Sequence, residues 1–197
     1  MSRRSITIAV LAGCGSLVLA GAPAVVAKET LIVEVAEIGT RYVLDLGQTQ
    51  PVRGTTFVTE GYLYADGTLT CDQAACDGVV YDAEGNPAPE FPDQVLGTWT
   101  CYGTFTGDAT TTSGPLLLST QLYDLGDSPG ADMMVTSGWE LADVGVPVSR
   151  AITGGTGEHA SVSGVQTQTL LGFNNGETVI ADAPAFGVAL RVELVTD

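Results

Sequence analysis

The stretch ITGGTGEHASVSG, residues 152–164, places four glycines among thirteen residues. Glycine adopts positive φ angles at no steric cost, so such a run suits either a phosphate-binding loop or a tight turn. Gly155, Gly157 and Ala160 have the spacing of the dinucleotide-binding fingerprint, and Glu177 follows about twenty residues later. That fingerprint must open a helix whose N-terminus faces the pyrophosphate, so the residues that follow decide between the two interpretations.

Those following residues have the character of a strand. Residues 162–169, VSGVQTQT, are rich in β-branched side chains and lack the apolar stripe of a helix. The Gly-Lys-Ser/Thr ending of a phosphate-binding loop is also missing from the sequence. We therefore predict a structural turn between two strands and expect no cofactor. The predicted turn consists of Gly154, Gly155, Thr156 and Gly157.

Strand signals continue along the rest of the chain, whereas helical periodicity is nearly absent. Most of the candidate strands are separated by clusters of Gly, Pro, Asp or Asn, which is typical of an antiparallel meander. The eight candidates are residues 30–37, 56–64, 95–105, 116–125, 133–141, 149–153, 162–173 and 187–195. Closure into a barrel removes the exposed edges of so many strands. We predict an all-β fold, a single eight-stranded antiparallel β-barrel over residues 28–197, with a long insertion at about residues 66–94.

Alternation of side chains predicts which residues face the barrel interior. The last strand places Val188, Leu190, Val192 and Leu194 on one face. Apolar residues that share one face of the third and fifth strands make candidate ligand-binding residues of Trp99, Phe105, Met133 and Trp139. A barrel of this size holds one small apolar ligand if its interior is not filled, and the alternative is that these side chains simply fill the core.

Polar residues in two strands are candidates for chemistry. Glu60 and Tyr62 share one face of the second strand, and inside a cavity such a carboxylate and phenol suit acid-base catalysis. On the outer face they are ordinary surface residues. Arg150 either pairs inside the barrel with an acid such as Glu140 or lies exposed at the start of a strand. His159 is expected to be a turn residue.

The first 27 residues are predicted to be a signal peptide. Arg3 and Arg4 precede an apolar run that ends in small residues at Ala24–Ala27, which favours secretion over a membrane anchor. Two alternatives stay open. Residues 11–14, LAGC, match a bacterial lipobox that would lipidate Cys14 and anchor the protein in a membrane, and the paired arginines match a twin-arginine export signal.

The charge of the chain limits its binding partners, and its cysteines predict a disulfide. The formal net charge is −16, and it becomes more negative when Arg3 and Arg4 leave with the signal, so nucleic acid and anionic membranes are excluded as partners. After removal of Cys14 three cysteines remain, and export favours a disulfide. We expect Cys101 to pair with Cys71 or Cys76, because the insertion leaves one strand near Cys71 and returns into the strand that carries Cys101. A local Cys71–Cys76 ring is the alternative, and no metal site is expected.

One family shares these features. Residues 150–170, RAITGGTGEHASVSGVQTQTL, resemble the segment of dirigent proteins and allene oxide cyclases in which a strand ends in Gly-Gly-Thr/Ser-Gly, and a glycine then opens the next strand. Residues 187–194, GVALRVEL, resemble the last strand of that family, and residues 97–101, GTWTC, resemble a strand of bacterial secreted relatives. His159 stands where the family usually has Phe or Tyr. The resemblance covers roughly the last third of the chain, and no catalytic residue of the family can be carried onto it.

The resemblance implies an eight-stranded barrel that binds a small hydrophobic molecule and steers its cyclisation or coupling without a cofactor. It also implies a homo-oligomer, since relatives are often trimers. The competing interpretation is a non-catalytic secreted carrier or structural barrel. An interior cavity with polar groups converging in it would favour the first function, and a filled core would favour the second.

Overall fold

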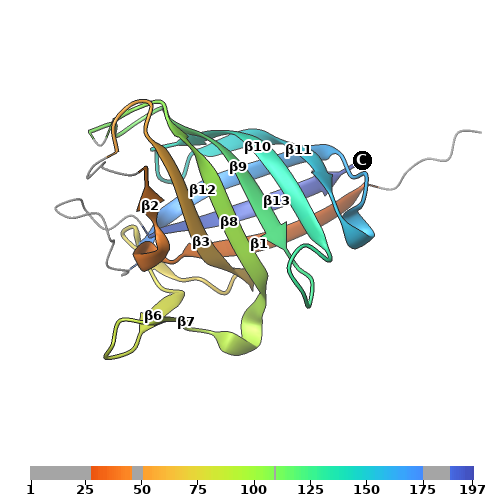
Figure 1. Ribbon diagram of the computed structural model, residues 1–197, viewed down its shortest axis with the longest axis horizontal. Coiled ribbons are helices and arrows are strands. Elements are labelled where there is room, and N and C mark those ends of the chain that lie inside the picture. Colours follow the sequence, from red (N-terminus) through yellow and green to blue (C-terminus); the bar gives the residue numbers. More distant parts are fainter. Residues whose placement is uncertain (1–27, 46–50, 109, 175–186) are drawn as a thin grey trace, which may run out of the picture.

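Eight long antiparallel strands close into a barrel in the computed structural model, which describes residues 28–45, 51–108, 110–174 and 187–197 (Figure 1). Around the barrel the order is β11-β10-β9-β8-β3-β1-β13-β12, and pairing of β11 with β12 closes it. The predicted fold class is therefore confirmed. The strands are β1 (Glu29–Glu37), β3 (Thr56–Ala65), β8 (Val95–Phe105), β9 (Pro115–Asp124), β10 (Met133–Leu141), β11 (Pro147–Gly155), β12 (Gly164–Asn174) and β13 (Val188–Thr196).

From β8 to β13 the chain is a meander in which strands that are consecutive in sequence pair with each other. The first strand, β1, lies between β13 and β3, and Val33 is opposite Val192 in the β1–β13 pair. The short strand β2 (Val43–Leu44) adds to β3 after the 3₁₀ turn η1 (Gly39–Arg41). Because the side chains alternate, every second residue of each long strand points into the barrel.

The glycine-rich segment joins β11 to β12 at one end of the barrel. Gly157 has a φ of +57° and begins the 3₁₀ turn η3 (Gly157–His159), and β12 starts five residues after η3 ends. A Cβ atom at Gly157 would lie 2.3 Å from the carbonyl oxygen of Ala131, so this position needs glycine for space as well as for φ. The described residues include no helix that is long and apolar enough to cross a membrane.

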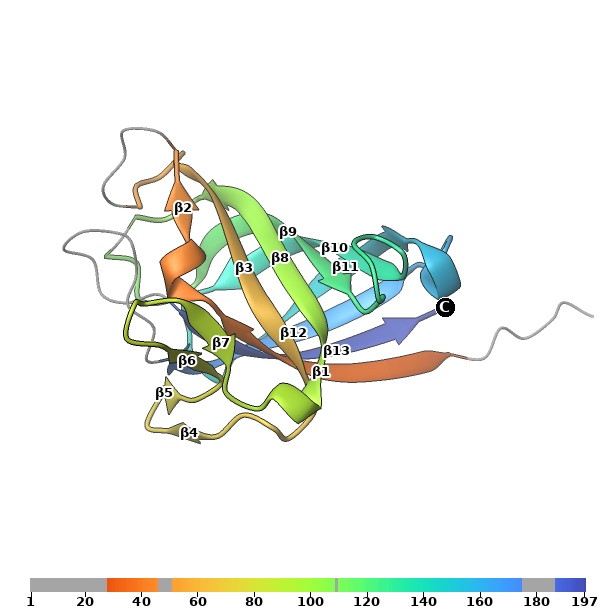
Figure 2. The same ribbon diagram turned by 60° about the horizontal axis from the view of Figure 1, so that its bottom comes forward.

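The long insertion packs against the outside of the barrel (Figure 2). Its elements are β4 (Cys71–Asp72), β5 (Ala75–Cys76), β6 (Val79–Tyr81), β7 (Pro87–Pro89) and the 3₁₀ turn η2 (Pro92–Gln94). The Tyr64 hydroxyl donates to the Gly78 carbonyl over 2.6 Å, and the Leu69 N–H donates to the buried carboxylate of Glu34 over 2.7 Å. A second small core therefore lies between the insertion and the outer face of β1 and β3.

The predicted pairing of Cys101 is wrong. Cys71 and Cys76 form the disulfide, while Cys101 is a free, buried thiol. The physical reason is a two-residue turn at Gln73 and Ala74, whose positive φ angles of 48° and 75° fold β4 back on β5 and set the two cysteine Cα atoms 4.1 Å apart. Cys101 points into the barrel core, whereas Cys76 packs in the outer cluster.

Candidate functional site

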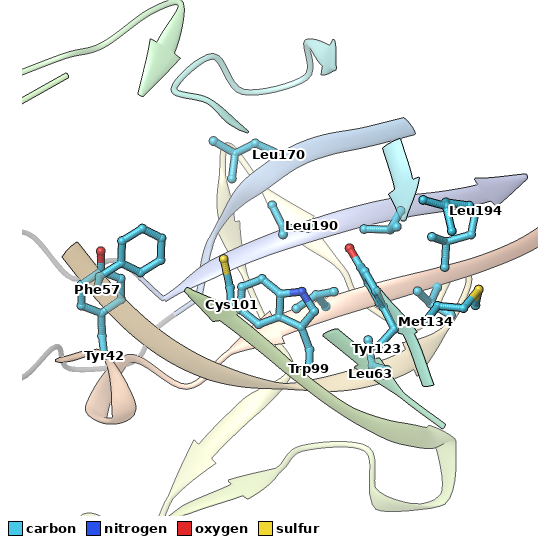
Figure 3. Close-up of a cluster of buried hydrophobic side chains, with 14 of the residues drawn as sticks. Tyr42, Phe57, Leu63, Trp99, Cys101, Tyr123, Met134, Leu170, Leu190 and Leu194 are labelled. Atoms are coloured by element: carbon cyan, nitrogen blue, oxygen red, sulfur yellow. The ribbon is translucent and has the colours of Figure 1, made fainter. Parts of the chain in front are cut away.

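One half of the barrel interior is a packed core and the other half contains a cavity of about 340 Å³. Figure 3 shows the transition: Tyr123, Met134 and Leu194 lie together on one side of Trp99, and Tyr42 and Phe57 lie on the other. The residues that line the cavity come from most of the barrel strands and the loops at their ends. They are Glu37, Tyr42, Pro51, Phe57, Thr59, Trp99, Cys101, Phe105, Asp108, Thr111, Thr112, Leu116, Leu117, Glu140, Leu141, Ala142, Gln168, Leu170, Phe173, Val188 and Leu190.

The walls of the cavity are aromatic and aliphatic. Tyr42 stacks on Phe57 with ring centroids 5.4 Å apart and planes inclined by 5°, and Phe57 in turn contacts Phe105 at 5.4 Å. Leucines of β9, β12 and β13 supply further apolar surface. A cavity of this size with walls of this kind matches the pockets in which proteins bury small molecules.

The inner end of the cavity is polar, and Glu140 is its centre. This carboxylate accepts hydrogen bonds from the Ser119 hydroxyl, from the Cys101 thiol over 3.4 Å and from the Gln168 amide over 3.3 Å. Its Oε1 lies 3.6 Å from Nη1 of Arg150, whose side chain is fully buried. Both carboxylate oxygens of Glu140 therefore accept hydrogen bonds from the protein itself.

Arg150 is held from several sides and does not line the cavity. Its guanidinium donates to the carbonyl oxygens of Gly138, Trp139 and Ser119 and to the Ser119 hydroxyl, over 2.9 to 3.1 Å. Of the two alternatives for Arg150, the structure shows the buried ion pair with Glu140. A buried charge pair of this kind needs such additional hydrogen bonds, because desolvation of two ions is costly.

A row of amides continues the polar layer behind Glu140. Gln121 donates to Gln168 over 2.8 Å, Gln166 donates to Gln121 over 3.0 Å, and the Tyr123 hydroxyl also donates to Gln121. All four side chains are buried. Burial raises the pKa of Tyr123 above its ordinary value, so this phenol acts as a hydrogen-bond donor. Gln168 lines the cavity and the other three side chains do not, so this row leads from the cavity wall into the packed half of the barrel.

Glu37 is a second acid at the cavity wall, at the end of β1. Burial raises its pKa to about 8, and the Val188 N–H, which donates to Oε2 over 2.8 Å, offsets part of that effect. Glu37 is therefore mostly protonated at neutral pH. Thr59 of β3 also lines the cavity beside Glu37, and its buried hydroxyl offsets part of the rise in the Glu37 pKa without making a hydrogen bond of ordinary length among the described residues.

The structure brings some of the expected ligand-binding residues to the cavity and not others. Trp99 and Phe105 are buried and line it. The expectation that Met133 and Trp139 face the interior is wrong, because Trp139 is 44% exposed and Met133 lies outside both the core and the cavity. The face of β10 that points inward carries Met134, Thr136 and Glu140. Because the inner face of β10 is largely polar, the alternation of apolar residues pointed to the outer face of this strand as the inner one.

The two catalytic candidates on β3 also lie on the outer face. Glu60 is exposed and its carboxylate pairs with Arg41 over 2.6 Å, and the half-buried Tyr62 donates to the Pro87 carbonyl of the insertion over 3.3 Å. Neither lines the cavity: Glu60 is a surface residue, whereas Tyr62 packs between the outer face of β3 and the insertion. His159 lies in the turn after β11, 3.9 Å from the Asp132 carboxylate.

Most of the polar groups at the cavity were not predicted from the sequence. Glu37 lies at the end of β1 and Thr59 lies on the inner face of β3, and neither residue was among the candidates. One signal was present, because Gln166 and Gln168 alternate with threonines in β12 and share the face of Leu170. A polar pair in register with apolar core residues indicates a buried polar layer.

Comparison with known proteins supports the fold. No protein-family model and no curated protein matches the sequence. A solved pterocarpan synthase dirigent protein matches with a TM-score of 0.53 and 10% identity, over 92% of this chain and 98% of that one. The chain has the dirigent barrel fold. A pyocyanin demethylase matches with a TM-score of 0.48 and 16% identity, over 85% of this chain and all of that one. At 10% identity the likeness to the dirigent protein concerns the fold alone.

Proposed function

We propose that this dirigent-like barrel is a secreted protein that binds a small hydrophobic molecule in the cavity and steers its cyclisation or coupling. The observation that carries the proposal is the cavity of about 340 Å³, with aromatic and leucine walls and a polar inner end that contains Glu37 and Glu140. A barrel that served only a structural role would gain stability by filling this space, because voids cost contact energy.

The walls provide both affinity and orientation. Burial of an apolar ligand is favourable by roughly 25 cal/mol for each Å² removed from water. The stacked pair of Tyr42 and Phe57 offers a flat aromatic surface, and Trp99 offers another. Holding a flexible molecule in one folded conformation accelerates an intramolecular reaction, because the entropy of bringing its ends together is lost on binding and not in the reaction.

The inner end provides acid chemistry without a cofactor. The protonated carboxyl of Glu37 donates a hydrogen bond or a proton to an oxygen atom of the ligand. Such general acid catalysis contributes about 10²- to 10⁴-fold in rate. Dry walls strengthen this interaction, because hydrogen bonds are stronger where water is excluded. Secretion fits the predicted signal peptide and the Cys71–Cys76 disulfide.

A pair of adjacent leucines on β9 allows a direct test of the cavity as the binding site. Leu117 lines the cavity, whereas Leu118 is 46% exposed on the outer face. The neutral dye N-phenyl-1-naphthylamine becomes fluorescent in apolar surroundings, and we expect saturable binding to the wild-type protein. Leu117→Phe fills part of the cavity and weakens this binding, while Leu118→Phe leaves it unchanged. No saturable fluorescence with the wild type, or equal effects of the two variants, would contradict the proposal.

A further inference from the structure

The hydrogen-bonding groups at the inner end of the cavity differ in whether their donor or acceptor positions are free to bind a ligand. Oε1 of Glu140 accepts from Ser119 and Cys101, Oε2 accepts from Gln168, and Arg150 neutralises the charge of this carboxylate. A cationic ligand would lose its hydration on entering the apolar cavity and would find the charge of Glu140 already paired. An ammonium group is therefore disfavoured here.

An anionic ligand is disfavoured for a different reason. The cation nearest the cavity, Arg150, is fully buried, is hydrogen-bonded to three backbone carbonyls and does not line the cavity. A carboxylate ligand would therefore meet the negative charge of the Glu140–Arg150 pair from its Glu140 side. Transfer of an unpaired carboxylate from water into such a site is strongly unfavourable.

The groups that remain are hydrogen-bond donors. The Val188 N–H occupies Oε2 of Glu37, so the proton of this acid belongs on Oε1, where it forms an O–H donor. The Thr59 hydroxyl is 1% exposed and lines the cavity beside the Glu37 carboxyl, with which it makes no hydrogen bond of ordinary length in the described residues. Buried polar groups normally have partners, so unpaired ones at a cavity wall indicate a missing ligand atom.

We propose that the cavity, in the role assigned to it under the proposed function, selects apolar molecules that carry one neutral hydrogen-bond acceptor, such as a ketone or quinone carbonyl, which receives hydrogen bonds from Glu37 and Thr59. The carbonyl oxygen has two lone pairs and no proton, so it matches two donors and repels neither. The apolar remainder of the molecule lies against Phe57, Phe105 and the leucines.

Four ligands with one naphthalene skeleton separate the alternatives: 2-acetylnaphthalene, its hydrocarbon analogue 2-isopropenylnaphthalene, 2-naphthoate and 1-(2-naphthyl)ethylamine. Each is titrated into the protein by calorimetry at about pH 6.5, where the carboxyl of Glu37 is protonated. We expect the ketone to bind about five- to tenfold more tightly than the hydrocarbon, and more tightly than either charged compound.

The variants identify the donors. Thr59→Val removes the hydroxyl at constant shape, and we expect it to abolish the advantage of the ketone over the hydrocarbon. Thr120→Val, a change on the outer face of β9, is the matched control that keeps the advantage. Because the panel of ligands is tested first on the wild-type protein, the proposal can be refuted even if a variant fails to fold.

A rise in pH supplies an independent readout. As the pH increases from about 6.5 to about 9.5 the Glu37 proton is lost, and ketone binding weakens by at least about fivefold while hydrocarbon binding changes less. The other ionisable groups that face Glu37 are Tyr42, Cys101 and Glu140; burial raises the pKa of the first two above their ordinary values, and Arg150 pairs with the third. Glu37→Gln removes the pH dependence, whereas Glu34→Gln, on the outer face of the same strand, keeps it.

The outcomes distinguish this inference from the proposed function. If no compound binds, the proposed function itself is wrong. If the hydrocarbon binds and the ketone binds no more tightly, or if the carboxylate or the amine binds most tightly, the cavity is a ligand site but its selectivity for a neutral acceptor is refuted.

Discussion

Arg150 of β11 and Glu140 of β10 form an ion pair inside the barrel, with 3.6 Å between Nη1 and Oε1 and with 0% and 8% of their side chains exposed. The pair lies between the packed half of the barrel and the cavity, so it has a structural and a functional consequence. The ion pair keeps Glu140 oriented at the inner end of the cavity. If either residue is replaced, the charge of the other stays buried without a partner.

Arg150→Met tests the structural consequence. Loss of the guanidinium leaves Glu140 without its ion pair and the Ser119, Gly138 and Trp139 carbonyls without this donor, and we expect the free energy of unfolding to fall by about 3 to 5 kcal/mol. Urea unfolding at neutral pH measures the change. Arg41→Met, which removes the exposed partner of Glu60, is the control and costs less than about 1 kcal/mol. Similar decreases in the free energy of unfolding of the two variants would show that removing Arg150 from its buried pair costs no more than removing an exposed arginine.

The pH dependence of stability tests the protonation of Glu37. Its pKa is about 8 in the folded protein and 4.5 as an ordinary glutamate, so the folded state retains a proton that the unfolded chain releases between these values. Stability therefore falls as the pH rises through this window, by about 1 kcal/mol per pH unit, and levels off above about pH 8. Glu37→Gln does not titrate, so the wild type loses stability relative to this variant from about pH 5 to about pH 8. A difference that stays constant over this range would show that Glu37 is ionised in the folded state.

The cysteines make a chemical prediction. Cys101 is 1% exposed, and burial raises its pKa well above the ordinary value, so we expect a bulky maleimide to label it only after unfolding. Under non-reducing conditions, peptide mapping should yield one linked peptide that contains Cys71 and Cys76. Labelling of Cys101 in the folded protein, or a linked peptide that contains it, would contradict the structure.

Position 157 needs glycine both for its positive φ and for lack of space, and a comparison with Gly145 separates the two effects. Gly145 has a φ of +78° with open space around its Cα, so Gly145→Ala measures the cost of positive φ alone, about 1 kcal/mol. At Gly157 the added methyl group also meets the Ala131 carbonyl and the Asp132 side chain. We expect Gly157→Ala to lower the midpoint of thermal unfolding clearly more than Gly145→Ala. Equal midpoints would mean that the turn adjusts freely.

Much of the barrel could be predicted from local patterns in the sequence. In β13, the alternation of Val188, Leu190, Val192 and Leu194 gives the inner face directly, because that face is apolar along its whole length. The glycines after β11 correctly suggested a turn, since positive φ is a local property. Both signals lie within a few neighbouring residues.

The inner end of the cavity could not be predicted in this way. On β10 the inner face carries Thr136 and Glu140 while Trp139 lies outside, so hydrophobic alternation selects the wrong face. The identity of this polar layer depends on Arg150, Ser119 and Gln168, which come from three other strands. The Cys71–Cys76 pair likewise depends on positive φ at Gln73 and Ala74, which are not typical residues for such a turn.

The most direct test of the account is whether an apolar molecule reaches Trp99 inside the barrel. Trp139→Phe leaves Trp99 as the sole tryptophan, and Trp99→Phe leaves only the exposed Trp139. Bromine quenches tryptophan emission only at short range, so both variants are titrated with 1-bromoadamantane, with adamantane as the control. We expect saturable quenching of Trp99 and none of Trp139. If Trp99 emission does not change, or if both tryptophans are quenched alike, the cavity is not a binding site.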